Sequence, residues 1–259
     1  MATKSVGFVG GGRVATILLG GLAKAGKLPA SVVVSDTNQE VLAKLKASHP
    51  SIETACCDNA AAAAQDIVFV AVHPPLVPEV VPGLRGALQP TAIVVSLAPK
   101  FTFAKLTELL GGFDRLARLI PNAPSIVGSG YNPVAFGAGL TDLDRANLLD
   151  LLAAVGEAPQ VAEEKLEAYA LTTAMGPSYL WYQLYELHAV AQACGLSKDE
   201  ACAGILQMVH GVAATMGGAG LSAQEVMDLI PVKPLADLEP VVAEAYRTKL
   251  PALFEKIRP

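Results

Sequence analysis

Residues 6–21 read VGFVGGGRVATILLGG, and this stretch decides the fold of the chain. A short apolar run predicts a buried strand, three consecutive glycines interrupt it, and Arg13 then begins a pattern with helical periodicity. A glycine-rich turn between a strand and a helix is where open α/β proteins bind the phosphates of a nucleotide.

Gly10, Gly12 and Ala15 form the pattern G-x-G-x-x-A in this stretch. The first glycine permits a tight turn, and the second lets the backbone approach a pyrophosphate. Ala15 lets the helix pack closely on the strand, while the N–H groups of the helix N-terminus face the anion. The stretch therefore predicts a dinucleotide cradle, and an incidental glycine turn is the alternative.

Asp36 ends the next predicted strand, 24 residues after Gly12. A carboxylate at this place accepts both ribose hydroxyls of NAD and repels the additional phosphate of NADP, so the residue favours NAD. The alternative is a helix N-cap, because NQEV follows at residues 38–41. The two roles are compatible.

Continuous apolar runs continue the pattern. The predicted strands are residues 5–10, 31–36, 66–72 and 91–98. Continuous rather than alternating apolarity indicates burial on both faces, as in a parallel sheet covered by helices. Strand and helix alternate as far as Leu119, which predicts a doubly wound α/β domain.

The pattern then changes. Residues 118–139 are rich in proline and glycine and predict loops and short strands, and the chain reads as helical from about Lys165. Residues 166–196 are apolar nearly all round, which is typical of a helix buried in a core or an interface. We therefore expect a dinucleotide-binding domain at 1–162 and a helical domain for dimerisation and substrate binding at 163–259.

The composition excludes several classes of protein. Of the 259 residues, 52% are hydrophobic and 17% are charged, and the net charge is −5. A disordered chain is excluded, and nothing indicates a nucleic-acid or membrane partner. The four cysteines have neither metal-ligand nor disulfide-framework spacing, and adjacent Cys56 and Cys57 are not expected to bond each other. We expect free thiols, no metal and a cytoplasmic protein.

The chain resembles the pyrroline-5-carboxylate reductase family over most of its length. DIVFVAVHPP at 66–75 is similar to the family's DVIVLAVKPQ, and RLIPNAPSIVGSG at 118–130 to its RVMPNTPxxVGxG. TAMGPSY at 173–179 is similar to SGSGPAY. The resemblance implies a Rossmann domain, a helical domain that interlocks with a second subunit, and hydride transfer from NAD(P)H to a cyclic imine.

The chain also departs from the family. His73 replaces a lysine, and IPVKPLAD at 230–237 replaces the SPGGTT loop, whose amides and hydroxyls hold the substrate carboxylate. Pro231 and Pro234 have no N–H to offer, so the same anion cradle cannot form. We expect turnover of pyrroline-5-carboxylate to be weak or absent. Lys233 is a candidate replacement anchor for an acidic substrate, and the alternative is a solvated loop lysine.

The predicted site combines the motif and the resemblance. Thr173 and Tyr179 are the candidate catalytic residues, and Ser178 joins Lys233 as a candidate substrate contact. The predicted cofactor contacts are Gly10, Gly11, Gly12, Arg13, Val14, Ser35, Asp36, Asn59, Val72, His73, Pro74 and Asn122.

Two functions of different class fit these residues. The first is an NAD(P)H-dependent reductase of a cyclic imine, acting as a homodimer or as a larger assembly of dimers. The alternative is a non-catalytic, nucleotide-sensing dimer that keeps the cofactor half and has lost the substrate cradle. A β-hydroxyacid dehydrogenase is disfavoured, because that class needs a lysine in the long central helix and none lies between Lys165 and Lys198.

Overall fold

The computed structural model describes residues 4–259. These residues form two compact units, each of which makes most of its contacts within itself. The first unit runs as far as Met175 and includes Leu253–Pro259, and the second is Gly176–Ala252. Each unit has its own architecture. The predicted domains, 1–162 and 163–259, stay a prediction.

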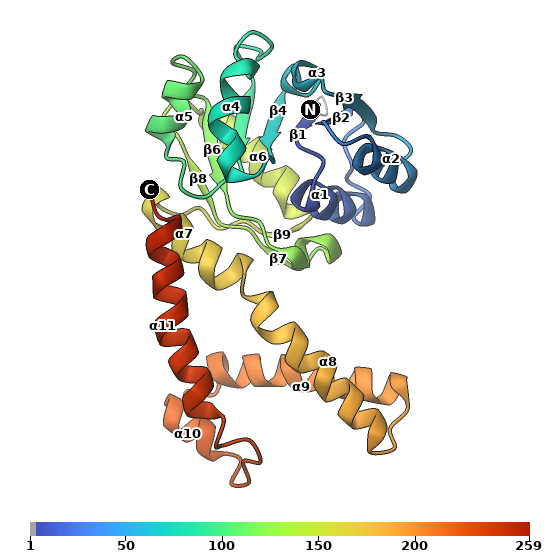
Figure 1. Cartoon of the computed structure of the whole chain (residues 1–259), viewed down its shortest axis with the longest axis vertical. Coiled ribbons are helices and arrows are strands. Elements are labelled where there is room, and N and C mark those ends of the chain that lie inside the picture. Colours follow the sequence, from blue (N-terminus) through green and yellow to red (C-terminus); the bar gives the residue numbers. More distant parts are fainter. Residues whose placement is uncertain (1–3) are drawn as a thin grey trace. The chain divides into compact units, whose positions relative to one another are not determined.

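The first unit is built on a seven-stranded sheet with the order β3-β2-β1-β4-β5-β6-β8 (Figure 1). Its strands are β1 (Val6–Val9), β2 (Val32–Asp36), β3 (Glu53–Cys56), β4 (Ile67–Val70), β5 (Ile93–Ser96), β6 (Leu116–Leu119) and β8 (Val134–Phe136). All neighbours are parallel except β6 and β8. A two-stranded sheet joins β7 (Gly130–Tyr131) to β9 (Gly156–Glu157).

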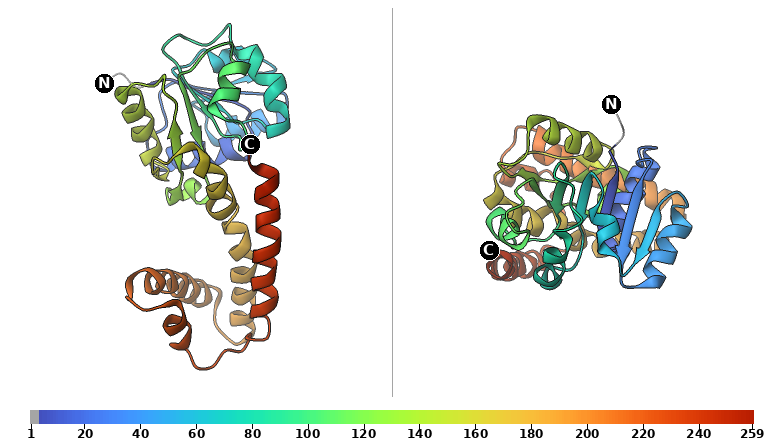
Figure 2. Two further views of the ribbon diagram at one scale, coloured as in Figure 1. Left: turned by 90° about the vertical axis from the view of Figure 1, so that its left-hand side faces the viewer. Right: turned by 90° about the horizontal axis from the view of Figure 1, so that it is seen from above.

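Helices cover both faces of the large sheet, as the continuous apolar strands predict (Figure 2). One face packs on α1 (Arg13–Lys24), α2 (Gln39–Ser48) and α6 (Asp142–Ala153). The other packs on α3 (Asn59–Ala63), α4 (Val77–Val80) and α5 (Phe103–Leu109). The predicted α/β class with a parallel, Rossmann-type sheet is confirmed.

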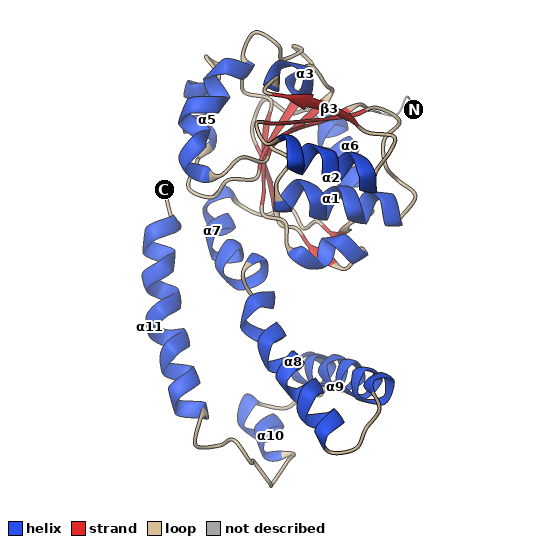
Figure 3. Ribbon diagram, turned by 45° about the vertical axis from the view of Figure 1, so that its right-hand side comes forward, coloured by secondary structure: helices blue, strands red, loops and turns tan. Residues whose placement is uncertain are grey.

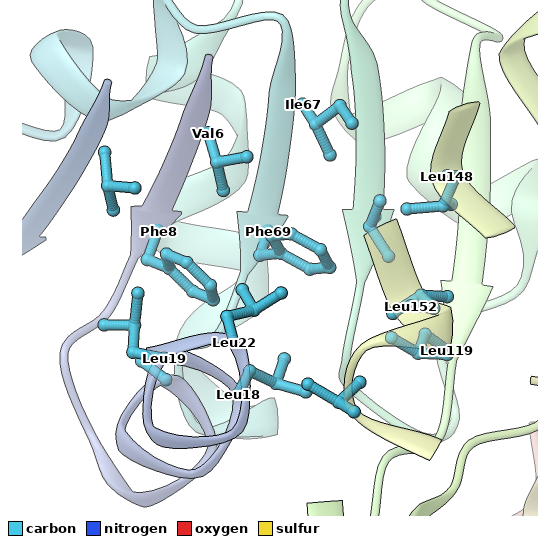
Figure 4. Packing of buried hydrophobic residues seen from close by; sticks show 14 of the residues in the cluster. Val6, Phe8, Leu18, Leu19, Leu22, Ile67, Phe69, Leu119, Leu148 and Leu152 are labelled. Carbon is cyan, nitrogen blue, oxygen red and sulfur yellow. The ribbon is translucent and has the colours of Figure 1, made fainter. Parts of the chain in front are cut away.

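The side chains of β1 show how successive residues supply the two cores. Phe8 points to the α1 face and stacks on Phe69 of β4, with ring centroids 4.9 Å apart, while Val9 belongs to the opposite core. Figure 4 shows Leu18, Leu19 and Leu22 of α1 packed beneath the two rings. The strand therefore ends in a fully packed layer, which fixes the position of the glycine loop that follows it.

The chain leaves the sheet through α7 (Leu166–Tyr169) and a π-helical turn, Ala170–Ala174. The second unit is helical throughout, as predicted (Figure 3). Its helices are α8 (Pro177–Ala193), α9 (Lys198–Gly218), α10 (Ala223–Asp228) and most of α11 (Glu239–Ile257). Within this unit α9 contacts both α8 and α10. Among the described residues, no helix is long and apolar enough to cross a membrane.

Candidate functional site

The glycine loop lies at the carboxyl end of β1, before the N-terminus of α1. Gly10 has a φ of +105°, and a Cβ there would lie 2.8 Å from the backbone of Ala71, so glycine is required. At Gly12 a Cβ would meet nothing within 4 Å, and no described side chain caps α1. Arg13 and Val14 form the first turn of α1. The space beside Gly12 is therefore open, and the start of α1 has no side-chain cap among the described residues.

Asp36 fixes this loop from the end of β2. Its Oδ2 accepts a hydrogen bond of 2.8 Å from the N–H of Gly11, and its Oδ1 accepts one of 2.8 Å from the N–H of Asn38. Asn38, rather than Asp36, is the N-cap of α2, because its side chain accepts from Glu40 and Val41. The carboxylate thus shapes the loop, and each oxygen keeps a lone pair for a ligand hydroxyl.

Ser35 and Asn59 meet beside the same sheet edge. The Ser35 hydroxyl donates to the Asn59 side-chain oxygen over 2.8 Å, which joins the end of β2 to the start of α3. Because ligands in open α/β sheets bind at the carboxyl ends of the strands, this edge is the expected place for a nucleotide. The structure therefore brings the predicted contacts Gly11, Asp36, Ser35 and Asn59 together.

The segment after β4 carries three further predicted contacts. The N–H of Ala71 donates to the carbonyl of Val9 over 2.8 Å, so this segment leaves the sheet directly beside the glycine loop. Val72 is half-buried, His73 is exposed, and Pro74 begins a short 3₁₀ turn. His73 accepts the N–H of Leu76 through its carbonyl, and its ring lies at the surface.

Asn122 joins the sheet to the π-helical turn. Its side-chain amide donates to the carbonyl of Thr173 over 3.3 Å and accepts from the N–H of Tyr131 over 3.0 Å. The Thr173 carbonyl would ordinarily bond to the N–H four residues on, but Pro177 has none. Asn122 is only 8% exposed. It therefore replaces a missing helical hydrogen bond, a role that the cofactor prediction did not include.

Thr173 lies in a π-helical turn, an element that occurs often at functional sites. The N–H of Met175 donates to the carbonyl of Ala170, five residues earlier, over 3.0 Å. The Thr173 hydroxyl donates to the carbonyl of Tyr169 over 2.8 Å. Its proton is thus used within the helix, and the oxygen remains able to accept a hydrogen bond.

A buried ion cluster was missed by the sequence analysis. Arg118, at the end of β6, is 1% exposed, and its guanidinium contacts Glu163 at 3.0 Å and Glu167 of α7 at 2.5 Å. The two carboxylates also accept the N–H groups of Phe103 and Lys100. The cluster holds the strand that leads to Asn122 against the helix that leads to Thr173. A charged residue within the apolar stretch LARLI at 116–120 was the available signal.

The remaining predicted residues belong to the helical unit. Tyr179 and Ser178 line a cavity of about 360 Å³ that also contains Lys249, and the Tyr179 ring meets Tyr246 edge-on, with centroids 5.8 Å apart. Burial and the neighbouring Tyr246 hydroxyl raise the pKa of Tyr179 above its ordinary value. The phenol is therefore protonated at neutral pH.

Lys233 lines a different cavity of the same unit, a groove of about 1000 Å³ with mainly apolar walls. Its ammonium lies 3.7 Å from the Asp228 carboxylate, which is a weak ion pair at this exposure. Within one chain, Lys233 and Tyr179 therefore line separate hollows. No cluster of three or more metal-ligating His, Cys, Asp or Glu side chains occurs in residues 4–259.

Comparison with known proteins finds similarity over most of the chain. Residues 5–100 match the family model described as NADP oxidoreductase coenzyme F420-dependent. The pyrroline-5-carboxylate reductase of Escherichia coli K12 is 27% identical over 230 residues, which cover 88% of this chain and 84% of that enzyme. The Pseudomonas aeruginosa enzyme is 29% identical over 214 residues, or 82% and 78% of the two chains. This chain is therefore similar to pyrroline-5-carboxylate reductases over most of its length.

Solved structures of pyrroline-5-carboxylate reductases share the fold over nearly the whole chain. The Coxiella burnetii structure has a TM-score of 0.70 at 25% identity, covering 98% of this chain and 94% of that one. The Plasmodium falciparum pyrroline carboxylate reductase with NADP bound has a TM-score of 0.80 at 19% identity, covering 99% and 96%. The predicted relationship is confirmed, as is the class of the family, NAD(P)-dependent oxidoreductases.

Proposed function

We propose that this chain is an NAD(P)H-dependent reductase of a cyclic imine other than pyrroline-5-carboxylate. The observation that carries the proposal is the loop at Gly12, where an uncapped helix N-terminus faces open space while Asp36 holds Gly11. This geometry suits a pyrophosphate at Gly12 and an adenosine ribose at Asp36. The likeness to the pyrroline-5-carboxylate reductases supplies the reaction class.

The bound nicotinamide would supply a hydride to the imine carbon. Asp36 and the Ser35–Asn59 pair would hold the adenosine end of the dinucleotide. Tyr179, protonated at neutral pH, is the group suited to hydrogen-bond the imine nitrogen or the amine that forms. Thr173 can accept from an N–H through its hydroxyl oxygen. An iminium is a good hydride acceptor by itself. The main task of the protein would therefore be to position the imine against the nicotinamide.

The segment at 230–237 supports a changed substrate. Pro231 and Pro234 lack an N–H, and the N–H of Ala236 donates to the carbonyl of Lys233 inside the segment. Three of the eight residues at 230–237 therefore have no backbone N–H to offer a carboxylate. Each hydrogen bond to a charged group contributes ~1.5–3 kcal/mol, so the loss of two or more weakens binding of an acidic imine by at least about a hundredfold.

The helical unit supports a homodimer. Apolar side chains along α8 and α9 are exposed, among them Trp181 at 46%, Tyr185 at 75% and Met216 at 77%. Single soluble chains rarely expose contiguous apolar patches of this kind. A second copy of the same helices is the occupant that matches these exposed apolar side chains, since like helices bury like faces in a two-fold interface.

A screen of cyclic imines with both NADH and NADPH tests the proposed function. We expect turnover of at least one imine, and kcat/KM for pyrroline-5-carboxylate at least about a hundredfold below that of the Escherichia coli relative. Proline formation at the relative's rate would refute the changed substrate. The modified segment also favours the nucleotide-sensing alternative, which predicts tight dinucleotide binding with no turnover of any imine, and that outcome would refute catalysis.

A further inference from the structure

Two adjacent thiols meet at the end of β3. Cys56 is the last residue of the strand and lies opposite Asp36 in the register of β2 and β3. Neighbouring residues of a continuing strand point to opposite faces. Cys57 instead takes a left-handed conformation with a φ of +58°, which ends the strand and leaves the two Sγ atoms 3.5 Å apart. Both cysteines are free and exposed.

The thiol pair borders the proposed adenosine end of the cofactor site. The N–H of Cys57 donates to the carbonyl of Asp36 over 3.0 Å, and the Asp36 carboxylate holds the N–H of Gly11. Two residues further along the chain, Asn59 accepts the Ser35 hydroxyl. The pair therefore lies between Asp36 and Asn59, at the carboxyl edge of the sheet where open α/β proteins bind ligands.

The separation of the sulfurs selects one kind of chemistry. A disulfide needs an S–S distance of about 2.0 Å, so the atoms would have to approach by about 1.5 Å across a backbone that is already left-handed. A single thiophilic atom placed between the sulfurs needs no such approach. The hydrogen bond with Cys56, the charge of Cys56, burial and the charge of Asp36 all raise the pKa of Cys57.

We propose that Cys56 and Cys57 form a dithiol site for trivalent arsenicals, and that an occupied site excludes the dinucleotide. With an arsenoxide, two As–S bonds form and the As–O bonds break. The two thiol protons leave with the oxygen as water. Arsenic stays trivalent and both sulfurs keep their oxidation state, so no electron donor or acceptor is required. The exclusion of the dinucleotide rests on the proposed function, whereas the dithiol site does not.

The chain carries its own control. Cys194 and Cys202 are also exposed, but they lie in the helical unit and make no sulfur–sulfur contact within the described residues. Single thiols bind arsenicals through one As–S bond, which an excess of a competing monothiol displaces. The Cys194→Ser/Cys202→Ser double variant should therefore behave as the unmodified protein does, while Cys56→Ser and Cys57→Ser should each lose the bridged adduct.

The experiment treats the full chain with phenylarsine oxide. Intact mass should show one adduct, formed with loss of one water, that survives excess monothiol and is removed by a dithiol such as 2,3-dimercaptopropanol. Fluorescence titration should then show NADH and NADPH binding at least about tenfold weaker in the adduct, with recovery after the dithiol. Cys57→Ser treated in the same way should keep its untreated affinity.

Each result decides one step. A monothiol-resistant adduct in Cys56→Ser, or none in the unmodified chain, overturns the dithiol site. A bridged adduct with unchanged dinucleotide affinity overturns the exclusion. If the untreated chain binds neither dinucleotide, the proposed function fails, and the adduct stoichiometry still decides the dithiol site.

Discussion

The sheet-based unit and the helical unit bury their apolar residues to very different extents. The first contains three buried clusters, two of them on opposite faces of its sheet. In Gly176–Ala252, all of which the structure describes, Ala201 is the one buried residue. Both units have apolar sequences, so composition does not explain the contrast. The first unit completes its core within one chain, whereas the second leaves large apolar side chains exposed, and the proposed dimer would cover them.

The largest expected effect is on dinucleotide binding by the sheet-based unit, which completes its core within one chain. Gly12→Val should abolish dinucleotide binding, a loss of at least about a hundredfold, because two methyl groups would occupy the place of the pyrophosphate. The fold should survive, since a Cβ at Gly12 meets nothing within 4 Å. Fluorescence titration measures the affinity. Gly86→Val, at another open glycine, is the matched control and should bind normally. Equal affinities in the two variants would remove the basis of the cofactor site.

The sheet was predictable because its central strands are continuous apolar runs. Val6–Val9, Val32–Asp36, Ile67–Val70 and Ile93–Ser96 all fall within predicted strands. The strand Glu53–Cys56 was not predicted, since ETAC at the sheet edge is largely exposed and has no apolar run. Edge strands carry this weak signal because one side of them has no partner.

The site was less predictable, because its contacts link distant parts of the chain. The partners of Arg118 lie 45 and 49 residues away, and no local pattern connects them. The bond from Asn122 to the Thr173 carbonyl had a local signal, since Pro177 four residues on leaves that carbonyl unpaired. The sequence did not indicate, however, which side chain would donate to the Thr173 carbonyl. The predicted roles of the site residues stay predictions.

The second prediction concerns the unit that lacks a core. Tyr185→Glu should raise the dissociation constant of the proposed dimer by at least about a hundredfold, because each large apolar side chain buried contributes ~1.5–3 kcal/mol and a two-fold interface loses two. Tyr185 is 75% exposed in the single chain. Leu143→Glu, at a 61% exposed side chain of the sheet-based unit, is the control and should leave the dimer intact. Light scattering distinguishes them, and an unmodified chain that is monomeric at micromolar concentration contradicts the dimer.

The third prediction tests the helical unit for a substrate role. Lys233→Met should raise KM for an anionic imine about tenfold, or ~1.4 kcal/mol, with NAD(P)H affinity unchanged. The Asp228 carboxylate 3.7 Å away holds the ammonium only weakly, so it remains able to bind an anion. Lys249→Met is the matched control, because that lysine lines the cavity that contains Tyr179. A rise in KM with Lys249→Met, and none with Lys233→Met, would contradict this prediction and indicate Lys249 as the anchor.

The smallest expected effect concerns a contact that fastens α6 to the sheet. Burial alone would raise the pKa of Asp144, but hydrogen bonds from Thr141 and Arg115 and the charge of Arg115 outweigh it and lower that pKa. The Arg115–Asp144 distance is 2.7 Å. A carboxylate whose pKa is lower in the folded state stabilises that state above its unfolded pKa, and the contribution disappears as pH falls through the folded pKa.

Asp144→Asn should therefore reduce the free energy of unfolding at pH 7 by about 1–3 kcal/mol, since it weakens a buried charge-assisted contact. The difference from the unmodified chain should narrow as pH falls below the ordinary value of 3.8. Glu108→Gln, in the exposed pair with Lys105, should change stability by no more than about 0.5 kcal/mol. Urea unfolding at several pH values and two protein concentrations measures these differences. Because Asp144 belongs to the unit that completes its own core, its effect should be the same at both concentrations, whereas that of Tyr185→Glu should depend on concentration. A concentration-dependent effect of Asp144→Asn would mean that the stability of the sheet-based unit also depends on a second chain.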